Sequence, residues 1–403
     1  MSQAYENATL FSPDLADKVL WELVLKMRLA SLFFLSLFFV SLTEAQIQSA
    51  PPALVPAYFD NLSSKVAFEK EVWDHRSELL LAIDNSLAFL SSPTADEAYA
   101  RFAAGGISRS HVHQSLERFR ELLLFSSSSE ELRESIFNEF MLYRSTGNDG
   151  QGTVRFTGYF QPVYKAARER SAEYRYPIYR MPADFNEWKK PHPTRTALEG
   201  YDGRGLNNGP LAGLELAWFK TRYEVFMIQL QGSALLELTD GTQMAVGFAA
   251  GTDYRFRGIP KEFLATQNVS WGNLGKHFAR HPEQLNYFQS RNNRFIFFRE
   301  NPTPDPIGSL GVPVVAERSI ATDKLKMPPG ALGLIFANIP YRSESGSLRL
   351  ARASRFVLDH DTGSAIKGPG RVDIFMGSGA EGQQKANYVS SNGELYYLLL
   401  KES

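Results

Sequence analysis

The sequence predicts a mainly β protein with an α-helical N-terminal part, and two observations carry this prediction. Between residues 62 and 143, apolar residues recur at helical spacing with charged residues between them. From Thr153 onward, short runs of β-branched and aromatic residues alternate with turn residues. With 403 residues, 43% of them hydrophobic, the chain is long enough for one large or two medium domains.

Charge and cysteine content exclude several functional classes. Lys and Arg (43) nearly balance Asp and Glu (44), so no basic surface of the kind that binds nucleic acid is expected. The sequence has no cysteine, which excludes disulfides, thiolate zinc sites, cysteine nucleophiles and a lipid-modified cysteine. This absence is compatible with an exported bacterial protein.

The N-terminal extension, residues 1–45, contains a predicted signal peptide. Basic Lys26-Met27-Arg28 precedes an uncharged apolar run, Leu29 to Leu42, and Thr43 and Ala45 occupy the positions before a possible cleavage site. An uncleaved anchor is the alternative, and Met27 is a second candidate start. We therefore expect export to the periplasm or cell envelope.

The helical N-terminal part is assigned to residues 46–150. Helical spacing covers 62–90 and 110–143, and Thr94 with Glu97 three residues later indicates a capped helix start. No cluster of titratable groups is visible in this part, so it is interpreted as packing scaffold.

The remaining elements are expected to be mostly strands. A polar stretch rich in Pro and Gly, from Asp184 to Pro210, suggests a crossing into another unit. One helix is expected at Leu274–His281. The predicted strands are 154–160, 176–180, 226–231, 245–248, 294–298, 314–315, 333–336, 355–358, 372–375 and 395–400.

The stretch from Asp361 to Phe375 is the strongest candidate for chemistry. Asp361 and Asp373 enclose a run that contains Gly363, Gly368 and Gly370, and Asp373 lies inside a short predicted strand. Glycines allow tight turns and close approach to a ligand, and a strand holds a carboxylate rigidly. A polar loop with aspartates as turn residues explains the same pattern.

Other catalytic motifs are weak or absent. His277 and His281 stand four residues apart, but no glutamate lies between them and Pro282 ends the helix, so no metal site is expected. His111-Val112-His113 is a still weaker pattern. The sequence contains no Gly-x-Ser-x-Gly, and Gly377 to Gly382 matches a dinucleotide motif without an expected helix after it. No cofactor is expected.

What remains is a set of carboxylates in a strand-rich region with aromatic and amide side chains. Sugar sites use these groups, because acids protonate glycosidic oxygens, aromatic faces stack on pyranose rings and amides bind hydroxyls. Core packing accounts for most of the aromatic residues equally well.

Several motifs in order resemble the membrane-bound lytic murein transglycosylase A family. The resemblance covers about Thr153 to Leu400. Its motifs are Thr157–Pro162, Tyr176–Tyr179, Pro193–Arg195, Gly213–Trp218, Ile228–Ser233, Gly247–Tyr254, Phe295–Phe298, Gly311–Pro313, Arg318–Asp323 and the stretch that contains Asp361 and Asp373.

The resemblance implies a double-psi β-barrel interrupted by a smaller, inserted β-rich domain, with a glycan-binding groove between them. On this basis the barrel is assigned to 151–190 and 306–403, and the inserted domain to 191–305. The C-terminal part resembles a three-aspartate domain, whose matching positions are Asp323, Asp361 and Asp373.

The implied reaction is non-hydrolytic cleavage of the β-1,4 bond between N-acetylmuramic acid and N-acetylglucosamine, which leaves 1,6-anhydro ends. The resemblance implies that Asp373, at the matching position, is the single acid/base. The predicted catalytic set is Asp373, Asp361 and Asp323. To start protonated near neutral pH, Asp373 needs a raised pKa, and burial or the negative charge of Asp361 can raise it. A nearby ammonium would oppose it, so Lys367 is assigned to substrate. The predicted substrate-binding residues are Tyr159, Gln229, Gln231, Ser233, Tyr254 and Lys367.

Two other functions fit the same residues. A hydrolytic glycosidase would use Asp361 as base and Asp373 as acid. A non-catalytic cell-wall glycan-binding protein would need neither.

Asp361 and Asp323 could also cap turns, and Lys367 could be a solvated loop residue. The expected partner is the peptidoglycan glycan strand, and no protein partner in the envelope is identified. Ser364 stands where this family commonly has glycine.

Overall fold

The computed structural model describes residues 52–59, 62, 72–73, 75–102 and 106–401. The predicted signal peptide lies outside these residues. Among the described residues, none of the helices has the length and apolar character needed to span a bilayer.

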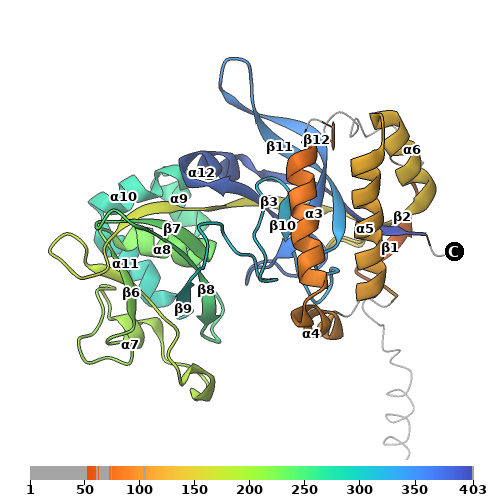
Figure 1. Ribbon diagram of the computed structural model, residues 1–403. Coiled ribbons are helices and arrows are strands. Elements are labelled where there is room, and N and C mark those ends of the chain that lie inside the picture. Colours follow the sequence, from red (N-terminus) through yellow and green to blue (C-terminus); the bar gives the residue numbers. More distant parts are fainter. Residues whose placement is uncertain (1–51, 60–61, 63–71, 74, 103–105, 402–403) are drawn as a thin grey trace, which may run out of the picture. The chain divides into compact units, whose positions relative to one another are not determined.

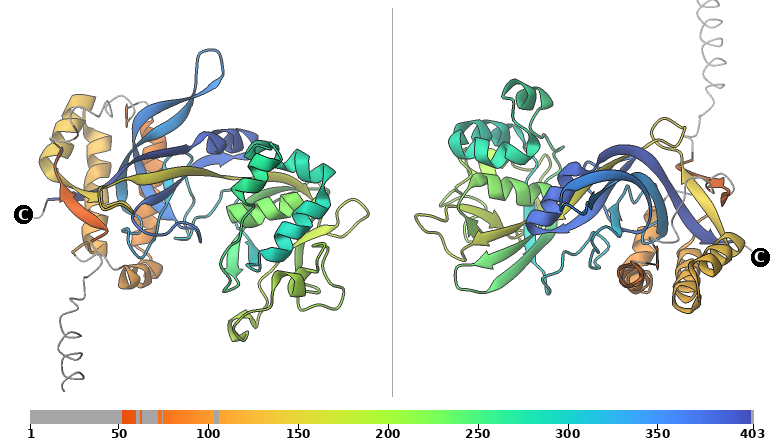
Figure 2. Two further views of the ribbon diagram at one scale, coloured as in Figure 1. Left: turned by 180° about the vertical axis from the view of Figure 1, so that it is seen from behind. Right: turned by 90° about the horizontal axis from the view of Figure 1, so that it is seen from above.

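Six strands form a closed barrel. Their order is β14-β11-β12-β10-β13-β3, and a further pairing between β14 and β3 closes the ring. Figure 2 shows the last strands of the chain, in blue, curving around this barrel. The predicted mainly β class is therefore confirmed. The barrel strands are β3 (Val154–Gln161), β10 (Ser319–Ala321), β11 (Leu332–Arg342), β12 (Leu348–Asp361), β13 (Arg371–Ser378) and β14 (Ser390–Leu400).

Two strands from the N-terminal part extend the barrel sheet. β2 (Phe140–Ser145) pairs with β14, and β1 (Leu54–Ala57) pairs with β2. The helical prediction for residues 140–143 was wrong. Phe140 continues the helical spacing of the preceding apolar residues, but Phe140 and Leu142 are both buried, which is strand alternation. Hydrogen bonding to the edge of β14 decides between the two patterns.

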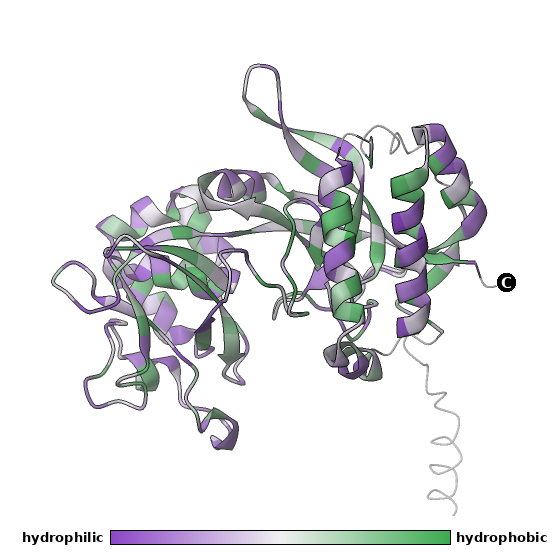
Figure 3. Ribbon diagram, viewed as in Figure 1, coloured by the Kyte–Doolittle hydropathy of each residue, from purple (hydrophilic) through white to green (hydrophobic). Residues whose placement is uncertain are grey.

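In the described part of the chain, the helices near these strands include α3 (Arg76–Leu90), α4 (Pro93–Arg101), α5 (Arg109–Phe125) and α6 (Ser129–Glu139). Helices α3 and α5 lie side by side, and they contact β12 and β14 respectively (Figure 1). Their apolar residues join the core of the barrel, and Figure 3 shows apolar and polar positions alternating along both helices. Helix α4 begins at Pro93 after Ser92, not after Thr94, since proline is favoured in the first helical turn.

A second sheet has the order β4-β7-β8-β9, and a separate pair is formed by β5 and β6. Strands β4 and β5 precede the predicted boundary at residue 190, and they pair with β7 and β6 respectively. The bounds are β4 (Val163–Ala166), β5 (Tyr176–Tyr179), β6 (Glu215–Phe219), β7 (Ser233–Leu238), β8 (Gln243–Gly251) and β9 (Ile296–Glu300). The helices of this part are α7 (Arg195–Glu199), α8 (Arg222–Gln231), α9 (Lys261–Thr266), α10 (Leu274–Arg280) and α11 (Pro282–Arg291).

Helix α8 occupies residues that were predicted as a strand, 226–231. Thr221 and Glu224 form a capping box at its start, and Gly232 ends it in the left-handed conformation. The hydrophobic run Val225 to Ile228 is buried, and such a short run fits a strand or a buried helix equally well. The cap residues were the signal that could have separated them.

Two further predictions were wrong. Helix α12 (Gly379–Tyr388) opens directly after Gly377, where no helix was expected. It connects β13 to β14, and β14 runs antiparallel to β3, so no parallel βαβ unit results. Val314 and Val315 form no strand, because the chain turns between Val315 and Ser319. The Val315 N–H donates to the Ser319 hydroxyl, and the Ser319 N–H donates to the Val315 carbonyl.

Candidate active site

Asp361 and Asp373 stand at the same level of the barrel on either side of one short strand. Ala321 of β10 is in register with Asp361 of β12 on one side and with Asp373 of β13 on the other. Asp373 is in turn in register with Thr157 of β3. Residues in register point to the same face, so the barrel places both carboxylates on one face, with their Cα atoms roughly 10 Å apart by strand spacing.

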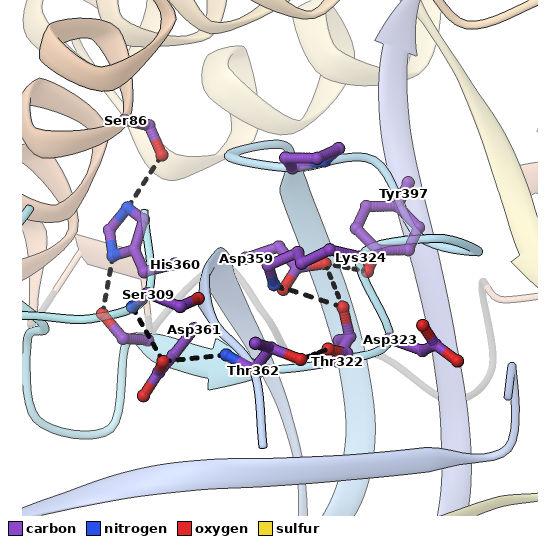
Figure 4. A network of polar contacts seen from close by, with 12 residues as sticks. Ser86, Ser309, Thr322, Asp323, Lys324, Asp359, His360, Asp361, Thr362 and Tyr397 are labelled. Atoms are coloured by element: carbon purple, nitrogen blue, oxygen red, sulfur yellow. Dashed lines mark hydrogen bonds and ion pairs between the residues drawn. The ribbon is translucent and has the colours of Figure 1, made fainter. Parts of the chain in front are cut away.

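An irregularity at His360 aims Asp361 toward this face. Asp359 pairs with Ile320 and Asp361 with Ala321, so His360 is an extra residue in β12. In a regular strand, Asp359 and Asp361 would share one face because they are two residues apart. The bulge separates them: Asp359 is buried against Lys324, Thr322 and Tyr397, whereas Asp361 points toward Ser309 and Thr362 (Figure 4).

Two adjoining cavities of about 450 and 490 Å³ contain the two aspartates. Asp373 lines the first and Asp361 the second. Residues of the barrel and of the second sheet region line both, so the cavities form one continuous candidate site. The shared lining residues are Tyr159, Gln229, Leu230, Gln231, Arg294, Ile296, Gly363 and Ser364.

Burial raises the pKa of Asp373 to about 6, and the negative charge of Asp361 adds to this effect. The guanidinium of Arg371, whose Nη2 lies 3.3 Å from Oδ1, opposes it. The side chain is 21% exposed, so it remains accessible from the cavity. Val372 and Ile374, on the other face of β13, are fully buried and fix the strand. The result is a rigidly held carboxyl group that takes up a proton near neutral pH.

Asp361 is held by two backbone amides. Its Oδ1 accepts hydrogen bonds of 2.8 Å from the N–H groups of Ser309 and Thr362 (Figure 4). Burial nevertheless raises its pKa above the usual value, while these amides and Lys324 act in the opposite direction. Asp361 is therefore both a turn-forming residue and a cavity residue.

The structure does not bring Asp323 into the cavities. Its carboxylate accepts hydrogen bonds from the backbone N–H groups of Gly368 (2.8 Å) and Leu325 (3.2 Å). Asp323 thus ties the loop between β12 and β13 to the segment after β10. The contacts of Asp323 therefore hold this loop, and Asp323 lines neither cavity.

Two predicted binding residues, Tyr159 and Gln229, line both cavities with buried polar atoms. The amide of Gln229 is buried and has no hydrogen-bond partner for either its Nε2 or its Oε1 among the described residues. The buried hydroxyl of Tyr159 makes no hydrogen bond of regular geometry with the described residues, although it lies close enough to Asp361 for the two groups to affect each other's pKa. Burial and the charge of Asp361 raise the pKa of Tyr159 well above its usual value, so it stays a donor. Unsatisfied buried polar atoms in a cavity indicate a ligand that satisfies them.

The other predicted binding residues divide into two groups. Ser233 and the exposed Lys367 line the second cavity, and Gln231 lines both while its Oε1 accepts from the Phe160 amide (3.1 Å). Tyr254 lines neither cavity, because its hydroxyl donates to the carbonyl of His192 (2.6 Å). Tyr254 thus contacts the segment around His192 and not the two cavities.

Sequence reasoning missed several cavity residues. Arg371 could have been found, since strand alternation places it on the face of Asp373. Its Nη2 also donates to the Thr157 hydroxyl (2.7 Å). Arg294 and the aromatic residues Phe256 and Trp271 also line the first cavity. They come from distant segments without a motif, and only the fold brings them together.

The glycines of the candidate stretch have different roles. Gly363 lines both cavities. Gly368 has a φ of 76°, and a Cβ atom on Gly370 would meet the backbone N of Asn148 at 2.4 Å. Gly368 and Gly370 therefore allow the loop to pack against its own protein, and only Gly363 is placed to approach a ligand.

The paired histidines do not assemble a metal site in the described part of the chain, where no group of three His, Asp or Glu side chains suited to a metal ion occurs. The Nε2 of His277 instead lies 2.7 Å from the Gln284 amide oxygen.

Comparison with known proteins agrees with this architecture. The chain matches the "MltA specific insert domain" over residues 155–299 and the "3D domain" over residues 318–399. It is 27% identical over 263 residues to membrane-bound lytic murein transglycosylase A of Escherichia coli K12, covering 64% of this chain and 68% of the relative.

Solved structures show the same fold. A membrane-bound lytic murein transglycosylase from Agrobacterium tumefaciens aligns over 86% of this chain and 98% of its own, with 24% identity and a TM-score of 0.65. E. coli MltA with bound chitohexaose aligns over 81% and 90%, with 23% identity and a TM-score of 0.61. On the two family models and these relatives, the chain belongs to the lytic murein transglycosylase A family of enzymes.

Proposed function

We propose that this protein cleaves the β-1,4 bond between N-acetylmuramic acid and N-acetylglucosamine in peptidoglycan and leaves 1,6-anhydromuramoyl ends. The observation that carries the proposal is Asp373, a strand-held carboxyl group in a cavity, whose pKa burial raises to about 6. The names of the relatives support peptidoglycan as the substrate.

Asp373 acts as acid and then as base. The protonated carboxyl group gives its proton to the oxygen of the departing N-acetylglucosamine as the bond from that oxygen to C1 of the muramoyl residue breaks. The resulting carboxylate then takes the proton from O6 of the same muramoyl residue, while O6 forms the new bond to C1. Asp373 ends protonated, as it began, and water is not consumed.

Asp361 supports this cycle electrostatically. Its negative charge raises the pKa of Asp373, which favours the protonated starting state. The two amide donors fix the direction of the Asp361 carboxylate, so this contribution does not depend on a mobile side chain.

The glycan strand occupies the two cavities. The unpartnered amide of Gln229 and the hydroxyl of Tyr159 are suited to sugar hydroxyl and N-acetyl groups. Phe256 and Trp271 offer partly exposed rings for stacking on pyranose faces. The related E. coli MltA crystallised with chitohexaose, a neutral glycan, supports this assignment.

We extend the proposal to architecture and location. The barrel is assigned double-psi topology, and strand pairing favours an inserted domain that begins after β3 and ends with β9. The helical N-terminal part, residues 46–150, is assigned as scaffold. The relatives named as membrane-bound support a location in the cell envelope.

Digestion of purified sacculi tests the function. We expect anhydromuropeptides by mass spectrometry from the wild type and none from Asp373→Asn, with Asp323→Asn as a comparison that retains partial activity. Reducing ends in place of anhydro ends would identify a hydrolase that uses Asp361 as base. Retained binding to sacculi without any turnover by the wild type would identify a glycan-binding protein and refute the proposal.

A further inference from the structure

Three cations line the cavities without an acidic partner. Arg294, Arg299 and Lys367 line the second cavity, and Arg294 also lines the first. Within the described residues, no salt bridge involves any of them. The other cationic cavity residues are different, since Arg195 pairs with Glu199 and Arg371 with Asp373. These three cations therefore form no ion pair with the acidic side chains of the described part of the site.

Arg294 is the best placed of the three. Its side chain is partly buried, and burial lowers its pKa below the usual value. Its Nη1 donates to the carbonyls of Thr252 (3.0 Å) and Tyr254 (3.2 Å), which fixes the guanidinium plane. Its Nη2 lies close to Gly251, where a Cβ atom would stand 3.0 Å away. The absence of a side chain at Gly251 thus leaves room for this group.

A partly buried guanidinium without an anion indicates an anion on the ligand. Desolvating a charge is unfavourable unless a partner compensates, and a fixed guanidinium fork matches a carboxylate. N-acetylglucosamine is neutral and offers no such group. Muramic acid differs from it by a 3-O-lactyl substituent, which carries a free carboxylate in stripped strands and a peptide stem with its own carboxylates in intact ones.

We infer that Arg294 binds a carboxylate attached to the glycan through the lactyl group of a muramoyl residue. The inference rests on the proposed function and adds the group that distinguishes the muramoyl unit from N-acetylglucosamine. Arg299 and Lys367, which are exposed, extend the positive field around Arg294 and attract the anionic strand at low salt.

Binding measurements on the Asp373→Asn chain test the inference without turnover. Three soluble ligands are compared by calorimetry: chitohexaose, stripped glycan oligomers with free lactyl carboxylates, and oligomers that carry peptide stems. Arg294→Gln should weaken binding of the carboxylate-bearing ligands about tenfold or more and leave chitohexaose unchanged. Arg294→Lys should restore part of the loss.

A matched control is Arg180→Gln. The Arg180 guanidinium also donates to a backbone carbonyl, that of Glu215 (2.8 Å), but it lines neither cavity, so all three affinities should be unchanged. Weaker binding of stripped oligomers by Arg294→Gln assigns the lactyl carboxylate as the partner of Arg294. Loss confined to stem-bearing oligomers assigns a stem carboxylate.

Equal losses for all three ligands, or no loss for any of them, would overturn the inference. If Arg294→Gln does not fold, methyl esterification of the ligand carboxylates replaces it: esterified oligomers should bind to the otherwise unchanged chain about tenfold more weakly, and unchanged binding would refute the inference. Sacculus digestion by the wild type is scored separately, so failure of the proposed function is distinguished from failure of this inference.

Discussion

The Nη2 atom of Arg371 lies 3.3 Å from Oδ1 of Asp373, two residues away on the same face of β13. A fixed positive charge beside a catalytic acid stabilises the carboxylate and lowers its pKa. Burial is the larger effect here, so the pKa of Asp373 is still raised to about 6. The pair therefore sets the pH range in which the acid is protonated.

Replacing Arg371 should shift this range upward. Arg371→Gln removes the charge that lowers the pKa of Asp373, so the alkaline limb of the kcat/KM profile should move to higher pH. Arg371→Lys keeps the charge and should shift less. The pH profile of glycan cleavage measures both variants. A limb that stays in place in Arg371→Gln would show that the pair does not control protonation.

Replacing Asp361 should have the opposite effect. Asp361→Asn removes a negative charge that raises the pKa of Asp373, so the alkaline limb should move to lower pH. Activity at pH 7 should fall, while part of it returns on acidification. Loss of activity that is equal at every pH would contradict this role and indicate direct participation of Asp361 in the chemistry.

The raised pKa of Asp373 also predicts a pH-dependent stability. The folded state holds this proton up to about pH 6, whereas the unfolded chain releases it near pH 3.8. The contribution of this proton to the free energy of unfolding is therefore fully present below pH 3.8 and is lost as pH rises through 6. The charged form costs about 2–3 kcal/mol above pH 6, an upper value because the side chain is partly exposed.

Asp373→Asn should remove this cost. Its free energy of unfolding should exceed that of the wild type by up to about 2 kcal/mol at pH 8, and the difference should close toward pH 4. Urea unfolding at several pH values measures this. As a control, Asp240→Asn changes an exposed aspartate whose pKa is lowered to about 2, so it should not gain stability at pH 8.

The fold was predictable where local pattern and packing agree. The barrel strands near Gly333, Arg355, Val372 and Leu395 follow from β-branched and aromatic runs. Helix α8 was missed because a short buried run has no distinguishing period, although Thr221 and Glu224 signalled the helix start. Closure of the barrel by β14 and β3 joins segments more than 200 residues apart, which no local pattern encodes.

The site was predictable to the extent that motifs carry it. Asp361 and Asp373 came from their glycine-rich spacing and the family resemblance. The motif match did not reveal that Tyr254 lies outside the cavities, because a motif does not show which way a side chain points. Arg294 has no motif, and only the fold brings it to the same cavities as Gln229. The bulge at His360 was hidden because alternation alone puts Asp359 and Asp361 on one face.

The last prediction concerns this bulge. His360 is fully buried, and burial and the nearby Lys324 lower its pKa to about 3, so the ring is neutral at all working pH values. Its Nε2 lies 2.8 Å from the Ser86 hydroxyl of α3 (Figure 4). Its Nδ1 lies 2.8 Å from the Ser319 hydroxyl. Helix α3 thereby fixes the extra residue that separates Asp359 from Asp361.

Ser86→Ala should loosen this attachment. Loss of one buried hydrogen bond should lower the free energy of unfolding by about 1–2 kcal/mol and lower kcat several-fold, because Asp361 is less firmly directed toward the cavity. Since His360 is neutral, neither effect should change between pH 5 and pH 8. Urea unfolding and sacculus digestion at both pH values provide the measurements. Ser77→Ala, an exposed change near the start of the same helix, should alter neither quantity. A stability loss with unchanged kcat would show that α3 supports the barrel without positioning Asp361.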